Sequence, residues 1–249
     1  MIPRTLHFIW INKRDFGEGE YYSVMSALQN TTYDVILHTD SSNIPILHPR
    51  FSIHYMTFPS VYEGVEVQTA HISDMWRTHI LQMYGGLYSD CDILWLKDLP
   101  IDPSATLVAT YDLQSYKHLT NSFLGAVKGH PALQELEDGV YEMLRNRNGK
   151  TLVKKSKPAY FAIYKVQIRI LKLRADQILH QSFINKNTHA RIGRAIAGTD
   201  SLRLKGISAF NWYNSMYPFD KIKLFLHEFL QILPLYVNQK LTPHIASSM

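Results

Sequence analysis

The sequence predicts an α/β protein built on a mostly parallel sheet with flanking helices. Short apolar, β-branched runs alternate with stretches of helical periodicity through residues 1–140. Hydrophobic residues make up 46% of the 249-residue chain, enough for a substantial buried core. The most structured stretch is His71 to Leu96, where a helix, a double glycine and a strand with two carboxylates follow one another directly.

The first elements predict a β-α-β unit. Thr5 to Ile11 is rich in apolar, aromatic and β-branched residues and is expected to be a buried strand. Glu20 to Asn30 is expected to be a helix, and Asp34 to Thr39 a second buried strand, joined by a right-handed crossover. Ser41 to Glu66 contains three prolines and predicts irregular structure with one short strand at Ser52 to Met56.

The next element is a helix with one apolar stripe. The stripe follows i, i+4 spacing, at Ile72, Trp76, Ile80 and Met83 or Tyr84. Asp74 and Arg77 lie off this stripe, three residues apart, and therefore share another face. Gly85 and Gly86 follow the last periodic residue, where a left-handed glycine can end a helix.

The chain then becomes extended in the run LYSDCDILWL, which starts at Leu87. A strand period of two would place Asp90 and Asp92 on one face and Cys91 on the other. The apolar run that follows is expected to be buried.

Further strands are expected at Leu107 to Thr110 and at Ser122 to Val127. Pro131 to Arg145 predicts a helix with proline in its first turn. From Lys150 the chain is basic with helical periodicity, and one helix face carries a basic triplet, Lys165, Arg169 and Lys172.

The change in composition suggests two parts of one compact domain. Residues 1–149 would form the core that carries the two carboxylates, and residues 150–249 a helical, basic extension with a late loop that completes the site. The aromatic-rich run Ala209 to Asp220 suits a loop folded over a site. A last amphipathic helix is expected from Asp220 to Leu233.

Charge is distributed unevenly along the chain. Residues 1–140 contain 8 Lys and Arg against 16 Asp and Glu, whereas residues 141–249 contain 18 against 5. The acidic N-terminal part fits a metal-binding region. The basic C-terminal part fits an anionic partner, or simply solvated helix faces.

Compartment and partners follow from composition. A single cysteine excludes an internal disulfide framework and favours a reducing compartment. Neither a signal peptide nor a membrane-spanning run is expected, because charges and Pro234 interrupt the longest candidate, Ile222 to Val237. We therefore expect a cytoplasmic protein, for which peripheral attachment at the inner face of a membrane is compatible with the sequence. No nucleic-acid motif is present, so no nucleic-acid partner is expected.

The carboxylate pair predicts a hard-cation site. Two carboxylates at i and i+2 near a strand end can bind Mg²⁺ or Mn²⁺ and leave coordination positions for a diphosphate. The plainer alternative for Asp90 and Asp92 is a solvated turn. A second enzymatic alternative is a phosphatase in which the first Asp is a nucleophile. That chemistry is disfavoured because it requires a long apolar strand before the pair and a follow-on such as Gly-Thr, whereas YGGLYS precedes this pair and ILWL follows it.

Three sequence blocks carry a family resemblance. They are LHFIWI at Leu6 to Ile11, ISDMWRTHILQMYGGLYSDCDIL at Ile72 to Leu94, and, more loosely, NSFLGAVKGHPALQEL at Asn121 to Leu136. The chain resembles the DXD glycosyltransferases of GT-A fold, in particular the family 32 mannosyl- and galactosyltransferases and the glucosyltransferase domains of large clostridial toxins. The middle block is specific and the outer two are supportive.

The resemblance implies a role for each matching residue. Trp10 would stack on the nucleotide base, and Asp74 and Arg77 would hold the donor sugar and diphosphate. Asp90 would bind ribose or sugar hydroxyls and metal-bound water, and Asp92 would coordinate Mn²⁺. Core packing for Trp10 and a surface ion pair between Asp74 and Arg77 remain the structural alternatives.

The resemblance is weaker on the acceptor side and towards the C-terminus. Asn121 and Ser122 would line the acceptor side. The family usually supplies one more metal or diphosphate ligand from a late loop, and no residue here aligns with it clearly. The candidates are Asn211, Trp212, Asn214, Ser215 and His227.

The leading hypothesis is a Mn²⁺-dependent, retaining glycosyltransferase that moves a hexose from a UDP- or GDP-linked sugar to a hydroxyl acceptor. The acceptor would be a glycan, a lipid-linked sugar or a protein, as in polysaccharide biosynthesis. The alternative is an anionic-surface-binding module with a degenerate, non-catalytic fold of this kind. Docking of Lys154 to Arg174 on anionic lipid is compatible with either function.

Overall fold

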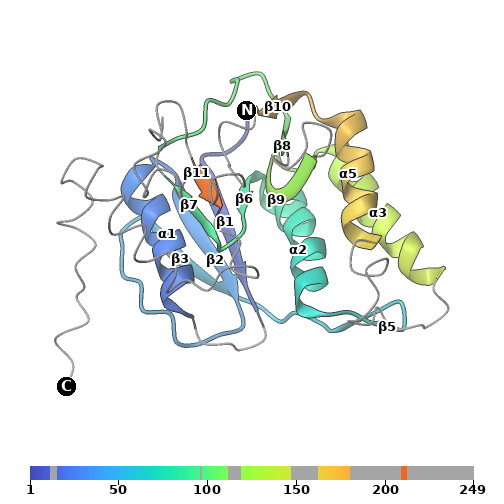
Figure 1. Ribbon diagram of the computed structural model, residues 1–249, viewed down its shortest axis with the longest axis horizontal. Coiled ribbons are helices and arrows are strands. Elements are labelled where there is room, and N and C mark those ends of the chain that lie inside the picture. Colours follow the sequence, from blue (N-terminus) through green and yellow to red (C-terminus); the bar gives the residue numbers. More distant parts are fainter. Residues whose placement is uncertain (12–15, 96, 112–118, 147–161, 180–208, 212–249) are drawn as a thin grey trace, which may run out of the picture.

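A computed structural model describes residues 1–11, 16–95, 97–111, 119–146, 162–179 and 209–211 of the chain. Seven strands form one sheet in the order β10-β8-β9-β6-β1-β2-β3 (Figure 1). β9 pairs antiparallel with both of its neighbours, and every other pairing in this sheet is parallel. The mostly parallel α/β architecture predicted from the sequence is confirmed.

The strands of this sheet are β1 (Thr5–Trp10), β2 (Asp34–Thr39), β3 (Phe51–Tyr55), β6 (Gly86–Ser89), β8 (Leu107–Tyr111), β9 (Leu119–Ala126) and β10 (Gln177–Leu179). The helices of the described chain are α1 (Glu18–Asn30), α2 (Thr69–Tyr84), α3 (Pro131–Arg145) and α5 (Ala162–Arg174). Two small two-stranded sheets are formed by β4 (Val61–Tyr62) with β5 (Val65–Glu66) and by β7 (Ile93–Trp95) with β11 (Ala209–Asn211).

The sheet is covered on both faces, because side chains alternate between two hydrophobic clusters along each strand. In β1, Leu6 and Phe8 belong to the cluster that α1 covers, whereas Ile9 belongs to the cluster formed with α2, α3 and α5. In β6, Leu87 and Tyr88 divide in the same way. This alternation follows from the strand period of two and produces three layers, with the sheet in the middle.

Several predicted elements are confirmed. The β-α-β start is present, with β1 and β2 paired in parallel from Thr5 opposite Asp34 to Trp10 opposite Thr39. The predicted bounds of β2 and α3 agree with the structure. Helix α2 begins at Thr69, before the predicted stripe, and ends at Tyr84; the next residue, Gly85, has the left-handed φ of 69° expected of a terminal glycine.

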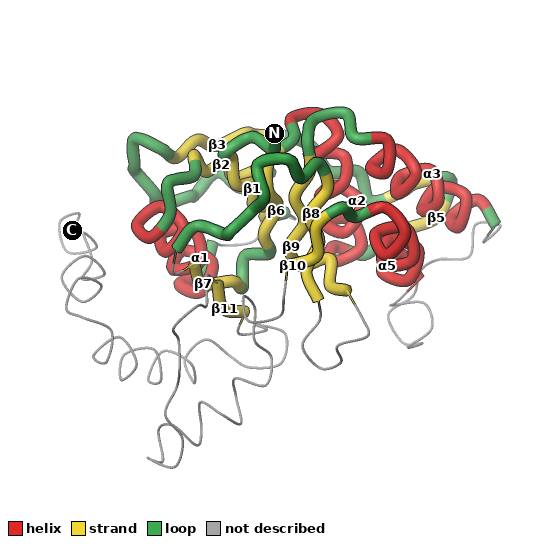
Figure 2. Tube along the Cα trace, turned by 90° about the horizontal axis from the view of Figure 1, so that it is seen from above, coloured by secondary structure: helices red, strands yellow, loops and turns green. Residues whose placement is uncertain are grey.

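The prediction of one continuous strand through the carboxylate pair is wrong. β6 ends at Ser89, residues 90–92 turn, and β7 begins at Ile93. The turn is required because β7 leaves the main sheet, contacts α1 and pairs with β11 (Figure 2). Cys91 therefore does not lie on the face opposite Asp90 and Asp92, and all three residues line one cavity.

Two other elements were not predicted. The irregular stretch before α2 contains the β4–β5 pair in addition to β3. The basic stretch predicted to be helical includes β10, which pairs with β8 and so extends the main sheet. The helix expected from Asp220 to Leu233 lies outside the described residues. No helix in the described ranges is long and apolar enough to cross a membrane.

Candidate functional site

The site lies where the strand order reverses. The chain runs outward from β1 through β2 to β3 and then returns to place β6 on the other side of β1. The carboxyl ends of β1 and β6 meet at Trp10 and Asp90, and ligands of open α/β sheets bind at such switch points. An open cavity of about 200 Å³ lies there, with Trp10, Ser73, Tyr88, Asp90 and Asp92 among its lining residues.

Two hydrogen bonds to backbone carbonyls hold the turn at residues 90–92 at the end of the sheet. The amide of Asp90 donates to the Ser122 carbonyl at 2.9 Å, and the Cys91 thiol donates to the Ile9 carbonyl at 3.4 Å. The first bond ties the turn to β9 and the second ties it to β1. The two carboxylates are therefore fixed between three strands.

Three polar side chains of α1 form hydrogen bonds with the segment that follows the turn. The hydroxyl of Ser23 donates to the Ile93 carbonyl at 2.6 Å, and the amide of Trp95 donates to the Ser26 hydroxyl at 2.9 Å. Asn30 donates to the Trp95 carbonyl at 2.8 Å. These α1 residues satisfy the backbone of β7, which has left the main sheet and needs other partners.

Arg77 is the buried hub behind the cavity. Its side chain is 5% exposed, and Nη2 lies 2.9 Å from Asp74 Oδ1 and 3.1 Å from Asp90 Oδ1. Nη1 donates to the Asn121 carbonyl and Nε to the Ser73 carbonyl, so each guanidinium nitrogen has a partner. The i, i+3 pairing with Asp74 that the sequence predicted is present, and it lies inside the protein.

Tyr88 connects this hub to the cavity. Its ring lies 4.5 Å from the Arg77 guanidinium carbon, as in a cation–π contact. Its hydroxyl donates to Asp90 Oδ1 at 2.6 Å, so the 3.2 Å contact with Ser73 Oγ requires the serine to be the donor. Burial raises the pKa of the Tyr88 phenol well above its usual range, and this keeps the hydroxyl protonated as a donor.

The charges of the hub are interdependent. Burial raises the pKa of Asp74 and of Asp90, while the Arg77 cation acts to lower both. Burial acts to lower the pKa of Arg77, yet Asp90, Tyr88 and Asp74 outweigh it and leave that pKa raised. One permanent cation therefore faces the carboxyl groups of Asp74, Asp90 and Asp92, so acidic groups outnumber basic ones around the hub.

Two amides hold Asp74 from the opposite side. Asn121 Nδ2 donates to Asp74 Oδ1 at 2.8 Å and to Gln167 Oε1 at 2.9 Å. Gln167 Nε2 donates to the backbone carbonyl of Asp74 at 2.6 Å. Asn121 comes from β9 and Gln167 from α5, so the basic C-terminal part of the chain reaches the site.

The predicted site residues divide into two groups. Trp10, Asp90 and Asp92 line the cavity, and the buried Arg77 lies behind it, paired with both Asp90 and Asp74. Asn121, expected on the acceptor side, is 8% exposed and bonded to Asp74. In the described ranges, no group of three or more His, Cys, Asp and Glu side chains could hold a metal.

The late-loop candidates are only partly placed. Asn211 is the Cα partner of Ile93 in the β7–β11 pair, so the backbone of this segment lies next to Asp92. Trp212, Asn214, Ser215 and His227 lie outside the described residues.

Sequence reasoning missed Tyr88, Ser73 and Gln167. Tyr88 could have been found, because it precedes Asp90 by two residues and so shares its face of the extended chain. Gln167 also left a signal, because it follows Ile163 by four residues on the buried stripe of α5. Neither signal identifies the partner across the fold.

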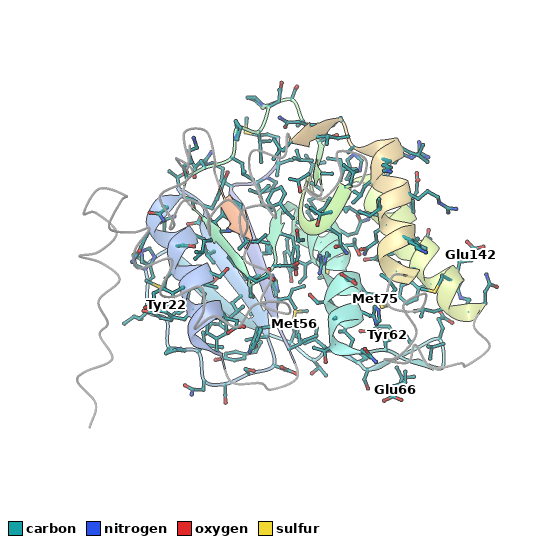
Figure 3. The ribbon with its side chains drawn as sticks, in the orientation of Figure 1. Tyr22, Met56, Tyr62, Glu66, Met75 and Glu142 are labelled. Atoms are coloured by element: carbon teal, nitrogen blue, oxygen red, sulfur yellow. The ribbon has the colours of Figure 1, made fainter. Side chains whose placement is uncertain are left out.

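A second cavity of about 80 Å³ lies beside α2 and α3, and its lining residues do not overlap with those of the first. Tyr62 and Met75, labelled in Figure 3, line it together with Trp76 and Glu137. Trp76 donates its indole N–H to the Tyr62 hydroxyl at 2.7 Å.

Comparison with known proteins shows which class of protein the fold and the site resemble. Residues 18–114 match the family model described as "Glycosyltransferase sugar-binding region containing DXD motif". These residues include α1, α2 and the Asp90–Asp92 turn. Residues 18–114 are thus similar to the sugar-binding region of the DXD glycosyltransferases, and the resemblance drawn from the sequence is confirmed.

Individual proteins agree with this class. Inositol phosphoceramide mannosyltransferase 3 of Schizosaccharomyces pombe is 27% identical over 139 residues, which cover 54% of this chain and 36% of that protein. The match therefore spans about a third of the relative's length. Among solved structures, the PaToxG glycosyltransferase superposes with a TM-score of 0.51 at 15% identity and covers 69% of each chain. At that identity the likeness shows a shared glycosyltransferase fold.

Proposed function

We propose that the protein is a metal-dependent, retaining glycosyltransferase that moves a hexose from a UDP- or GDP-linked sugar to an acceptor hydroxyl. The observation that carries the proposal is the cavity at the β1–β6 switch point, with Trp10, Asp90 and Asp92 on its wall and the buried Arg77 hub behind. An aromatic ring and two carboxylates at one strand end suit a base and a metal-bound diphosphate.

The carboxylates fit a divalent cation. Asp90 and Asp92 are oxygen ligands on the cavity wall, and a single buried guanidinium leaves their charge in excess. Mn²⁺ or Mg²⁺ held there would neutralise the charge that develops on the departing nucleoside diphosphate. Ligands beyond this pair would come from the donor or from the late loop.

The protein's own residues position the donor. Trp10 would stack on the base, and Asp90 would accept from ribose or sugar hydroxyls. Asp74 Oδ1 already accepts from Arg77 and Asn121, so its second oxygen is the one proposed to accept from the donor sugar. The contact of Arg77 with the diphosphate remains a prediction, because all three of its nitrogens have partners within the protein.

The curated relative suggests which substrates to test first. Its name specifies a mannosyl group and an inositol phosphoceramide acceptor. We therefore propose mannose as the first donor sugar and a lipid-linked acceptor as the first acceptor class, with glycan and protein acceptors next.

Membrane contact is part of the same proposal. Lys165, Arg169 and Lys172 are exposed on α5, whose apolar face packs against α3 and β9. The exposed basic face of α5 can dock on anionic lipid and bring a membrane-bound acceptor to the site. A non-catalytic module that binds anionic surfaces would use the same basic face. Turnover of a nucleotide sugar therefore distinguishes the enzyme from that alternative.

The test is a screen of UDP- and GDP-linked sugars with Mn²⁺, measuring release of the nucleoside diphosphate. Wild-type protein should hydrolyse one donor slowly even without an acceptor, and Asp92→Asn should lower that rate at least about 100-fold. Asp34→Asn is the matched control, because this exposed carboxylate begins β2 at the opposite end of the sheet. Full activity of Asp92→Asn, with its thermal unfolding unchanged, would refute the proposal.

A further inference from the structure

Gln167 is the residue of α5 that reaches the donor site, and it lies outside residues 18–114, which match the family model. Its side chain is buried, and its two amide atoms join β9 to α2. A buried glutamine on an apolar helix face requires an explanation, because an apolar residue of the same size would pack there without polar atoms to satisfy.

The hydrogen bonds around it form a closed circuit with one consistent orientation. Asp74 Oδ1 is a carboxylate acceptor, so the Asn121 atom bonded to it is the amide nitrogen. The second hydrogen of that nitrogen goes to Gln167, so the glutamine presents its oxygen to Asn121 and its nitrogen to the Asp74 carbonyl. Reversing either amide would set two acceptors or two donors against each other.

The circuit fixes Asp74 at two atoms. Gln167 holds the backbone carbonyl at 2.6 Å, and through Asn121 it holds the carboxylate as well. Gln167 thus binds the main chain of Asp74, and Asn121 binds its Oδ1. In the described ranges no hydrogen bond to Asp74 Oδ2 is found. The rotation of the Asp74 carboxylate is therefore set by groups that leave its second oxygen available.

We infer that Gln167 is a positioning residue for donor-sugar recognition, which acts by orienting Asp74 and makes α5 part of the donor site. The inference rests on the proposed function. Gln167 is hydrogen-bonded to Asp74 and Asn121, so a change at Gln167 affects the sugar contact of Asp74 and spares the base and ribose contacts proposed for Trp10 and Asp90.

The experiment compares two affinities for each variant. One is for the UDP- or GDP-linked sugar that the donor screen identifies, and the other is for the corresponding UDP or GDP, both measured calorimetrically with Mn²⁺ on the full chain. Gln167→Met keeps the length and helix propensity of the side chain but removes both hydrogen bonds. It should weaken binding of the nucleotide sugar about tenfold and change binding of the free nucleotide less than about twofold.

A stability control separates positioning from folding. Ile170→Ala removes a buried side chain on the same helix that does not take part in the circuit, and it should destabilise the protein without changing the ratio of the two affinities. If Gln167→Met does not fold, Gln167→Leu serves instead, since it also removes the amide group and keeps most of the buried volume.

The outcomes are distinguishable. Loss confined to the nucleotide sugar supports the inference. Equal loss for both ligands, or no loss, overturns it and leaves Gln167 with a structural role only. Wild-type protein that binds no nucleotide sugar overturns the proposed function, and with it the inference.

Discussion

Two buried histidines make the stability of the fold depend on pH. His7 of β1 and His38 of β2 are fully buried, with His7 Nδ1 2.9 Å from His38 Nε2. His7 Nε2 lies 2.9 Å from the Gly85 carbonyl and must donate to it, so His7 Nδ1 accepts from His38. Both rings are therefore neutral with the proton on Nε2. In the described chain, His38 Nδ1 has no hydrogen-bond partner that could stabilise a second proton.

The pKa shifts define the pH range affected. Burial lowers the pKa of His7 from 6.5 to about 4, opposed by the Gly85 hydrogen bond and assisted by His54. Burial also lowers the pKa of His38 from 6.5 to about 3, assisted by the charges of His7 and His54. Between these values and 6.5 the unfolded chain binds more protons, so stability falls as pH falls. From about pH 7.5 to about pH 5 each ring contributes a loss of ~2 kcal/mol, or ~4 kcal/mol together.

The assay is urea unfolding at those two pH values, with free energies from linear extrapolation. His38→Gln removes one titrating ring but keeps an amide donor for His7, so the loss on acidification should shrink by about half. His79→Gln is a control of opposite sign. The hydrogen bond with Glu137 raises the pKa of His79, so this pair stabilises the acid side and its removal should steepen the loss. An unchanged pH dependence in His38→Gln would refute the reasoning.

Two further predictions concern the basic helix and the terminal glycine of α2. Replacing Lys165, Arg169 and Lys172 with Glu should weaken binding to anionic vesicles, measured by sedimentation at low salt, about 100-fold. The control Lys97→Glu, at another exposed lysine, should have little effect. Failure of the wild type to sediment at any salt concentration would contradict the docking proposal. Gly85→Ala should destabilise the protein by at least ~2 kcal/mol more than Gly129→Ala in thermal or urea unfolding. Both glycines have φ of 69°, but a Cβ at Gly85 would lie 2.6 Å from the Lys128 amide nitrogen, and one at Gly129 would contact nothing within 4 Å. Equal costs would show that the close approach does not matter.

Local patterns predicted the elements of the first half well. Thr5 to Ile11 and Asp34 to Thr39 are rich in apolar and β-branched residues, as is typical of strands buried on both faces, and both form strands of the central sheet. The helix of Asp74 and Arg77 was found from its stripe and its glycine end. Such signals are local, so no knowledge of the rest of the fold was needed.

The errors concern contacts distant in sequence. The strand through Asp90 and Asp92 was predicted as continuous because the residues around the pair are typical of a strand. In the structure, hydrogen bonds to Ser23 and Ser26 of α1 hold β7 away from the main sheet. Likewise β10 was predicted as helix, although pairing with β8 makes it a strand. In both cases tertiary contacts overrode a local preference, and the sequence alone does not show those contacts.

The location of Asp74 and Arg77 is the most informative difference between prediction and structure. A surface ion pair was the structural alternative, and burial at 5% exposure of Arg77 rejects it. Burying one cation with two carboxylates stabilises a fold no better than apolar residues of the same volume would, so stability alone does not account for the hub. The atoms it uses do suggest a purpose. Arg77 donates to Oδ1 of Asp74 and to Oδ1 of Asp90. The same oxygen of Asp74 also accepts from Asn121, and the same oxygen of Asp90 also accepts from Tyr88. Each carboxylate is thereby held by one oxygen, which fixes the direction of the other in advance. Such preorganisation is what recognition of a polar donor requires, because the cost of orienting the carboxylates is met during folding and not during binding.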